Sequence, residues 1–313
     1  MRSLHRRSIR PTRFAAALAA LASTLLLVAG CGASTQATGD SGTIVIGSKN
    51  FTENEILAQM MADLIHANLP KMNVQLKLDM GGTLPVFEAL KAGQVDVYPD
   101  YTGTGYIEIL KQPKPASEQA MYNFVQRQYE KKWGLEWLKP IGFNDTYAIA
   151  IPQSLARKDH VTTISQLVPY AGKLTAGIDA ECQVRPDCLP GLAQDYGLHF
   201  GKVLTIDHSL IYQAMAEGRI QATDAFTTDG GLEKYHLQVL KDNKGFFPAY
   251  FAAPVIRQDF LRQHPKVASV LNKLAGQISD REMAHLNYEV DISKQSIQSV
   301  AKDFLVSKGI LKG

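Results

Sequence analysis

The chain has 313 residues, of which 45% are hydrophobic, and carries a formal net charge of +3. This length allows one large or two medium domains with substantial cores. Removing the five arginines of residues 1–30, a segment without acidic or Lys residues, changes the net charge from +3 to −2. A nearly neutral remainder gives no reason to expect binding to nucleic acid or to an anionic membrane.

Residues 1–30 have the layout of a secretory signal, in which arginines precede an apolar run from Phe14 to Val28 that is too short and wrongly flanked for a membrane span. The next residues, Val28-Ala29-Gly30-Cys31, resemble the lipobox of bacterial lipoproteins. This resemblance implies that Cys31 is lipidated, and a plain signal peptide is the alternative. Residues 31–42 are predicted to form a flexible tether. We therefore expect an exported protein, lipid-anchored to the outer face of the cytoplasmic membrane or in the periplasm.

Strands and helices alternate in the next part of the chain, which predicts βαβ units and a mainly parallel sheet. Thr52 and Glu55 predict a capping box at the start of the first helix. The elements expected here are a strand at 43–47, a helix after Thr52, a strand at 74–78, a helix ending at Gly93 and a strand at 95–98.

A second α/β series is predicted from Tyr147 onward, with strands at 147–151, 174–177, 203–206 and 220–226 and helices near 164–170, 191–196 and 210–217. A last strand ends at Ile256 and helices follow. Crossings between two lobes are expected near Asn144–Thr146 and Phe247–Ala249. Lobe I is then residues 43–146 plus 250–313, and lobe II is residues 147–249.

Two stretches, 89–102 and 214–227, share one pattern: Ala, Gly four residues later, an aliphatic residue two further on, and an aromatic-Thr pair at the end. Each reads as a helix ended by Gly, a short strand, and a ring at the carboxyl end of the strand. Because open α/β sheets bind ligands at these ends, each lobe would bring an aromatic wall to a shared cleft. This layout is typical of a binding protein.

Four aromatic residues lie at the repeat or crossing positions, namely Tyr101, Tyr147, Phe226 and Tyr250. Together they could enclose a cation without hydrogen-bond donors, such as a quaternary ammonium, which ring faces attract. Ordinary core or interface packing is the alternative for each ring taken singly.

Three polar residues could hold an acidic group of the same ligand. Lys49 follows the first strand, Arg185 lies in the Cys182–Cys188 loop, and Thr104 follows Tyr101 by three residues. A guanidinium can bind a carboxylate through two hydrogen bonds. Solvated surface positions are the alternative. In an exported protein a Cys182–Cys188 disulfide is favoured over two free thiols, and two cysteines without a nearby His pair do not indicate a metal site.

At this point the chain resembles the substrate-binding proteins of osmoprotectant (glycine betaine/choline) ABC transporters, over most of its mature length. The resemblance rests on four segments: Gly47-Ser48-Lys49-Asn50-Phe51-Thr52-Glu53, 96–104, Phe226-Thr227-Thr228-Asp229-Gly230 and Ala249-Tyr250-Phe251-Ala252-Ala253-Pro254.

This resemblance implies a two-lobe periplasmic-binding-protein fold of type II, acting as a monomer without cofactor and delivering a trimethylammonium compound to an ABC permease in the membrane. The family's tyrosine cage would correspond to Tyr101, Tyr147, Phe226 and Tyr250, and its carboxylate-binding residues to Lys49, Thr104 and Arg185. Family members often have Tyr where this chain has Phe226, which keeps the ring face and loses the hydroxyl. Tyr212 is assigned to packing.

An enzyme and a structural lipoprotein are the rival classes. The sequence contains no Gly-x-Ser-x-Gly, His-Glu-x-x-His or Walker A motif. Surface or packing roles are expected for His160, His199, His208 and His236, and turn or helix-cap roles for Asp100, Asp224 and Asp229. The paired cations favour a zwitterion such as glycine betaine, carnitine or ergothioneine over choline, and an amino acid is the nearest alternative ligand.

Overall fold

The computed structural model describes residues 41–113, 115 and 117–312. The predicted signal segment, Cys31 and nearly all of the predicted tether lie outside the described residues, so those assignments stay predictions.

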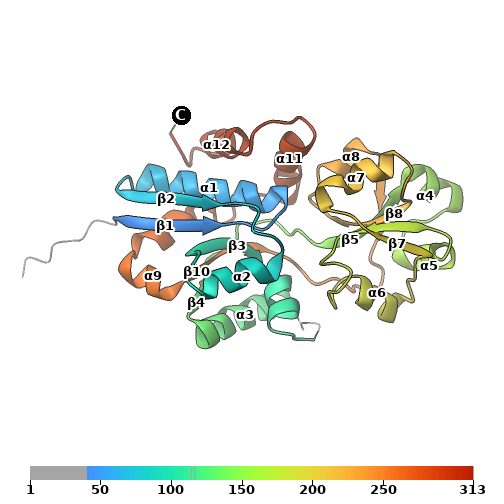
Figure 1. Ribbon diagram of the computed structural model, residues 1–313, viewed down its shortest axis with the longest axis horizontal. Helices are drawn as coiled ribbons and strands as arrows, with labels where there is room; N and C mark the ends of the chain where they lie inside the picture. Colours follow the sequence, from blue (N-terminus) through green and yellow to red (C-terminus); the bar gives the residue numbers. More distant parts are fainter. Residues whose placement is uncertain (1–40, 114, 116, 313) are drawn as a thin grey trace, which may run out of the picture. The chain divides into compact units, whose positions relative to one another are not determined.

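The described chain contains two sheets of the same design (Figure 1). We call the parts that carry the first and second sheets lobe I and lobe II, and the exact lobe limits stay a prediction. The first sheet has the order β2-β1-β3-β10-β4 and the second the order β7-β6-β8-β5-β9. The first comprises β1 (Gly42–Gly47), β2 (Met72–Lys77), β3 (Val97–Tyr101), β4 (Leu135–Trp137) and β10 (Ala252–Arg257). The second comprises β5 (Tyr147–Pro152), β6 (Thr175–Ile178), β7 (Lys202–Thr205), β8 (Ala222–Phe226) and β9 (Leu237–Val239).

The α/β fold class is confirmed, but both sheets are mixed rather than mainly parallel. In the first sheet β1 pairs parallel with β2 and β3, whereas β10 pairs antiparallel with β3 and β4. In the second sheet β6 pairs parallel with β7 and β8, whereas β5 pairs antiparallel with β8 and β9. The reason is that β5 and β10 are the first strands after the chain passes from one sheet to the other. They run opposite to the βαβ strands that they join.

Alternation along the strands gives each sheet two buried faces. In β3, Val97 and Tyr101 belong to the same hydrophobic cluster as α1, while Tyr98 between them packs in the cluster with α2 and α3. Helix α1 also packs against α10, α11 and α12. The lobe I helices are α1 (Thr52–Asn68), α2 (Thr83–Lys91), α3 (Glu118–Trp133), α9 (Gln258–Gln263), α10 (Lys266–Leu271), α11 (Asp280–Asp291) and α12 (Ile297–Ser307). Two shorter helical segments join them, a π-helix at Thr104–Ile109 and a 3₁₀ helix at Asn272–Leu274.

Lobe II carries α4 (Gln153–Asp159), α5 (Ile164–Ala171), α6 (Leu189–Tyr196), α7 (His208–Ala216) and α8 (Gly231–Lys234). Helix α5 begins with a capping box between Thr163 and Gln166. The capping box predicted for α1 is wrong, because this helix follows Phe51 and has no side-chain cap. Thr52 lies inside the first turn, where its hydroxyl donates to the carboxylate of Asp291 on α11 instead.

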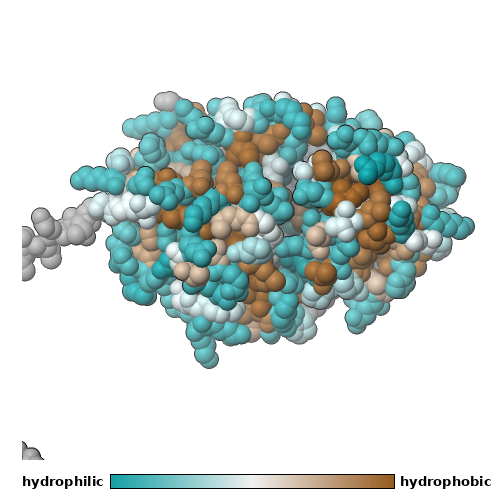
Figure 2. All heavy atoms as spheres, viewed as in Figure 1, coloured by the Kyte–Doolittle hydropathy of each residue, from teal (hydrophilic) through white to brown (hydrophobic). Residues whose placement is uncertain are grey.

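Polar residues cover most of the face in Figure 2, and hydrophobic residues reach this surface in limited groups between them. Within the described ranges the large hydrophobic side chains with substantial exposure are Leu84, Tyr170, Val184, Val203 and Leu210. They come from several different elements, so the apolar surface is mainly internal.

The core around α1 yields a stability prediction. Leu57 is fully buried on this helix, whereas Leu84 on α2 is 51% exposed. Leu57→Ala should lower the free energy of unfolding by about 2–5 kcal/mol because it leaves a cavity. Urea denaturation measures the change. Leu84→Ala, the same substitution at an exposed site, should cost under about 1 kcal/mol, and equal losses would contradict this description of the core.

Candidate ligand-binding site

Two adjoining cavities are lined by residues of both lobes. The smaller, of about 40 Å³, is lined by all seven ligand-contact residues expected from the sequence: Lys49, Tyr101, Thr104, Tyr147, Arg185, Phe226 and Tyr250. The larger cavity has a volume of about 460 Å³. The two share Asn50, Phe51, Asp145, His208 and Phe226 as lining residues. The structure therefore brings the candidates together at one place.

Strand ends place the four aromatic candidates. Tyr101 is the last residue of β3 and Phe226 is the last residue of β8, the middle strands of the two sheets. Tyr147 begins β5 directly opposite Phe226 in the antiparallel register. Tyr250 comes two residues before Ala252, which lies opposite Tyr101. The repeat and the crossing positions thus converge on the same edge of each sheet.

The rings contact one another around the smaller cavity. Tyr147 lies 4.9 Å from Phe226 and 5.6 Å from Tyr250, measured between ring centroids. Phe51, which was not among the expected contacts, stacks 5.4 Å from Phe226 and lies 6.0 Å from Tyr101. Phe51 therefore joins the aromatic residues of the two lobes. Its position two residues after Lys49, in the same strand-to-helix loop, was the available signal.

Gly103 lets the backbone approach the face of the Tyr250 ring. A Cβ atom at this position would lie 2.6 Å from two ring carbons of Tyr250. A side chain here would push the ring aside, so the glycine fixes how deeply Tyr250 enters the cleft.

Carboxylates hold two of the cage hydroxyls. The Tyr101 hydroxyl donates to Glu53 Oε1 at 2.8 Å, and the Tyr250 hydroxyl donates to Asp187 Oδ2 at 2.7 Å. Burial raises the pKa of Tyr101, Tyr147 and Tyr250 well above the usual value for a phenol. The three rings are therefore neutral at physiological pH, with their hydroxyl orientation set by the carboxylates in two cases.

Lys49 is buried and paired. Its Nζ lies 2.8 Å from Asp100 Oδ1, and the two side chains are 4% and 0% exposed. Nζ also lies 5.2 Å from the centre of the Tyr101 ring. Asp100 is a residue of β3 that accepts a hydrogen bond from the Tyr98 hydroxyl, so its assignment to a turn or helix cap is wrong. A buried ammonium is tolerable only with such a partner, and Asp100 supplies it.

Arg185 is also buried and paired, but it keeps contacts across the cleft. Its Nε and Nη2 donate to Asp187 at 2.9 and 2.6 Å. Its Nη1 and Nη2 lie 3.4 and 3.3 Å from the hydroxyls of Thr83 and Thr104 in lobe I. The guanidinium carbon is 5.4 Å from the centre of the Tyr147 ring. The bonds to Asp187 are short, whereas those to the threonines are long and can be exchanged for a better acceptor.

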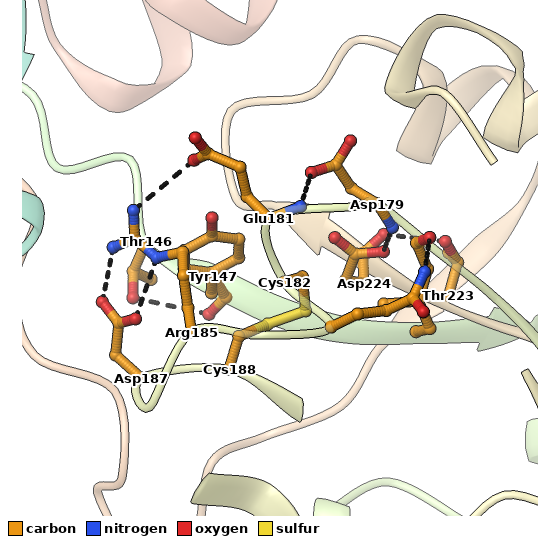
Figure 3. Close-up of a disulfide and its surroundings, with 12 residues drawn as sticks. Thr146, Tyr147, Asp179, Glu181, Cys182, Arg185, Asp187, Cys188, Thr223 and Asp224 are labelled. Atoms are coloured by element: carbon orange, nitrogen blue, oxygen red, sulfur yellow. Dashed lines mark hydrogen bonds and ion pairs between the residues drawn. A yellow bond between two sulfur atoms is a disulfide. The ribbon is translucent and has the colours of Figure 1, made fainter. Parts of the chain in front are cut away.

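The loop that carries Arg185 is closed at its base (Figure 3). The Cys182 and Cys188 sulfur atoms are within bonding distance, and their Cα atoms are 5.0 Å apart, as a disulfide requires. Asp224 lies close to both sulfur atoms, and these three form the group of potential metal ligands found among the described residues. Sulfur atoms bonded to each other cannot act as thiolate ligands, so the group does not fit a metal.

The larger cavity has an acidic lining: Glu53, Glu55, Asp79, Asp145, Asp207, Asp229 and Asp291, with Lys294 and His208 as its cations. Burial, together with the negative charges of Asp79 and Asp291, raises the pKa of Glu55 to about 7. The second cavity therefore differs in character from the aromatic one.

His208 connects the two cavities and was missed, because a lone histidine was assigned to the surface or to packing. It is the first residue of α7, three residues after the end of β7, and so lies at a strand-to-helix connection, as Lys49 does after β1 in lobe I. Its ring lies 4.8 Å from Phe226, and its Nε2 is 3.0 Å from Asp229 Oδ1. Tyr212 also lines the larger cavity and donates its hydroxyl to Asp229, so its role is more than packing.

The family model for the substrate-binding domain of ABC-type glycine betaine transport systems matches residues 42–307. The chain belongs to this family. A glycine-betaine-binding protein of Pseudomonas aeruginosa is 35% identical over 275 residues, which are 84% of this chain and 87% of that protein.

A second relative is the ergothioneine transport permease/ergothioneine binding protein of Helicobacter pylori, 35% identical over 270 residues. The match covers 85% of this chain but only 48% of that longer protein. The crystal structure of a glycine betaine/carnitine/choline ABC transporter superposes with a TM-score of 0.70 at 31% identity. The match covers 85% of this chain and 98% of the chain in that structure.

Members of this family are extracytoplasmic proteins that bind a small ligand and interact with a membrane permease. In the part of the chain that the structure describes, none of the helices combines the length and the hydropathy needed to cross a membrane.

The His208–Asp229 pair gives a titration prediction. Burial opposes the charged imidazolium, but Asp229, with smaller effects from Asp224 and Asp179, outweighs it and raises the pKa of His208 to about 9. The pair therefore stabilises the protein fully below about pH 6.5, and this contribution is lost as the pH rises through about 9.

An NMR titration of the histidine ring signals measures this pKa. Asp229→Asn should move it well below 9, whereas Asp207→Asn, on the exposed helix cap next to His208, should leave it in place. A wild-type His208 pKa below the ordinary value would show that the ion pair does not form.

Proposed function

We propose that this protein captures a quaternary ammonium zwitterion, glycine betaine or a related betaine, outside the cytoplasm and delivers it to an ABC permease. The observation that carries the proposal is the smaller cavity, where four aromatic side chains from both lobes meet beside two buried cations. The names of the relatives support the same ligand class.

The aromatic residues suit the cationic end of a betaine. A trimethylammonium group donates no conventional hydrogen bonds, so it leaves no unsatisfied donor in a cavity walled by rings, and the ring faces compensate its charge. Each ring face contributes about 0.5–2 kcal/mol of cation–π attraction, depending on how dry the contact is. Tyr101, Tyr147, Phe226 and Tyr250 supply such faces, and we add Phe51 because it stacks between Tyr101 and Phe226.

Arg185 suits the acidic end. Its short bonds to Asp187 fix the plane of the guanidinium. Its contacts to Thr83 and Thr104 are long, so the N–H groups that make them can instead donate to a ligand carboxylate. The Lys49 ammonium is bonded to Asp100 at 2.8 Å, so we propose that it attracts the ligand carboxylate through its positive charge and not through a direct hydrogen bond. Choline has no carboxylate and would leave these N–H groups without a better acceptor.

Ligand entry requires the lobes to separate. A cavity of about 40 Å³ holds only a few water-sized groups, at ~10–15 Å³ for each. Contacts of Arg185 with Thr83 and Thr104 currently bridge the lobes at this cavity. We propose that the crossings act as the hinge and that the lobes close again over the ligand.

A second candidate ligand is a bulkier betaine such as ergothioneine. The larger cavity adjoins the aromatic one and offers about 460 Å³ with many hydrogen-bond acceptors, which a compact betaine does not use. An amino acid on the same fold is the remaining alternative. A thermal-shift and calorimetric panel of glycine betaine, carnitine, ergothioneine, choline and amino acids separates them. Saturable binding without turnover is expected.

The location follows the same proposal. The secretory signal at residues 1–30 and the lipobox at Cys31 would place the protein on the outer face of the membrane, tethered through residues 31–42 and acting there as a monomer.

The aromatic cage predicts the effect of ring removal. Tyr101→Ala or Tyr250→Ala should weaken glycine betaine binding more than about tenfold, since one desolvated ring contact is worth up to ~2 kcal/mol. Isothermal calorimetry measures the dissociation constant. Tyr250→Phe keeps the ring and should lose less than Tyr250→Ala. Tyr170→Ala, at a partly exposed position outside both cavities, is the control. Unchanged affinity in a cage variant removes that residue from the cage.

Arg185 predicts ligand selectivity. Arg185→Ala should weaken glycine betaine binding at least about tenfold more than choline binding, because a hydrogen bond to a charged group is worth about 1.5–3 kcal/mol. Taking the ratio of the two losses cancels the general cost of leaving Asp187 unpaired. The same loss for both ligands would mean that Arg185 does not read the carboxylate.

A further inference from the structure

A single hydroxyl links two buried carboxyl groups beside the aromatic cage. Thr228 Oγ1 lies 2.6 Å from Glu53 Oε2 and 2.6 Å from Asp145 Oδ1. The three residues are 1%, 3% and 4% exposed. These distances are those of strong O–H···O bonds, so both contacts need a proton.

Counting protons shows that one carboxyl group is protonated. A threonine hydroxyl has one hydrogen and can donate to only one of its two neighbours. The other short contact therefore requires a carboxyl O–H that donates to Thr228. Glu53 already accepts from the Tyr101 hydroxyl at 2.8 Å and from Asn287 Nδ2 at 3.1 Å, which identifies it as the ionised partner. The proton belongs to Asp145.

The network connects the two lobes. Glu53 on α1, Tyr101 on β3 and Asn287 on α11 come from lobe I. Thr228 follows β8 in lobe II, and Asp145 lies two residues before Tyr147 at the first crossing. Asn287 also donates to the backbone carbonyl of Thr228 at 2.9 Å. One of the contacts between the lobes thus also holds the Tyr101 hydroxyl.

The charged surroundings favour keeping this proton. Burial raises the pKa of Asp145 well above its usual range, and repulsion from Glu53 and Asp229 adds to the effect. Burial also raises the pKa of Glu53, but the hydrogen bonds from Thr228, Tyr101 and Asn287 oppose that rise. The groups facing the pair are Tyr101 from β3, Asp229 after β8, and Tyr212 from α7. The cations that line the smaller cavity together with Asp145 all have acidic partners: His208 on α7 is paired with Asp229, Lys49 with Asp100 and Arg185 with Asp187.

We propose that lobe closure traps one proton between Glu53, Asp145 and Thr228, so that these positioning residues make ligand affinity decrease as the pH rises. The inference rests on the proposed function. When the lobes separate, Thr228 withdraws and water reaches both carboxyl groups. They then ionise with ordinary pKa values near ~4. Closure therefore takes up a proton between about pH 5 and 7 and becomes less favourable across that range.

Calorimetry with glycine betaine tests the proposal. The dissociation constant should rise up to about tenfold per pH unit between pH 5 and 7, as uptake of one proton requires. Titrations at pH 6.5 in two buffers of different ionisation enthalpy should report about one proton taken up per ligand bound. Affinity independent of pH, or zero proton uptake, would overturn the inference while leaving betaine binding established.

Variants assign the proton to this network. Asp145→Asn places an uncharged donor where the protonated carboxyl stands, so proton uptake and the pH dependence should disappear. Thr228→Val removes the bridging hydroxyl and should weaken binding most at low pH. Asp63→Asn is the matched control, because Asp63 is a carboxyl on α1 whose pKa is also raised by burial but which bonds only Gln59 on the same helix. It should keep the uptake of the wild type.

Proton uptake with other ligands keeps the two proposals separate. If no betaine binds, the proposed ligand is refuted, and the two-buffer calorimetry is repeated with whichever other compound of the panel binds. Uptake of about one proton per ligand in the wild type and none in Asp145→Asn would still support the trapped proton, and zero uptake in both proteins would refute it.

Discussion

The cleft depends on the antiparallel pairing between the middle strand of each sheet and the strand that has just arrived from the other lobe. In lobe II this pairing sets Tyr147 directly opposite Phe226, and in lobe I it brings the segment before β10 beside the end of β3. Side chains at these strand ends face the same space because both sheets follow the same strand order. A shift of one residue in either register would turn the rings to the other face. The register of two strand pairs therefore defines the site.

Charge in the cleft is organised by partners within the chain. Lys49 has Asp100, Arg185 has Asp187, His208 has Asp229, and the Glu53–Asp145 pair has a proton. Burying any of these groups alone would cost several kcal/mol. The buried cations beside the aromatic residues therefore each have an acidic partner before a ligand arrives. Binding then exchanges a few long contacts and does not have to neutralise an isolated charge.

The residues at the ends of the strands could be predicted from the sequence, because periodicity and the repeat at 89–102 and 214–227 are local signals. The sequence located Tyr101 and Phe226 at the ends of equivalent strands, and the structure brings all seven candidate residues to one cavity. It misjudged what depends on contacts between distant elements. Nothing local shows that Asp100 would meet Lys49, that the Thr52 hydroxyl would find Asp291, or that His208 would stand beside Phe226. The mixed sheets were missed for the same reason, since strand direction after a crossing is a long-range property.

The state of the loop between Cys182 and Cys188 depends on whether the protein folds in an oxidising or a reducing compartment. Arg185 stands in a ring of only a few residues, and its aim at Thr83 and Thr104 across the cleft relies on that ring being shut. Chains produced in a reducing cytosol would lack this closure and would have to order the loop each time a solute arrives. Preparations from the cytoplasm and from the periplasm would thus differ chemically at this loop, even where their folded parts have the same sequence.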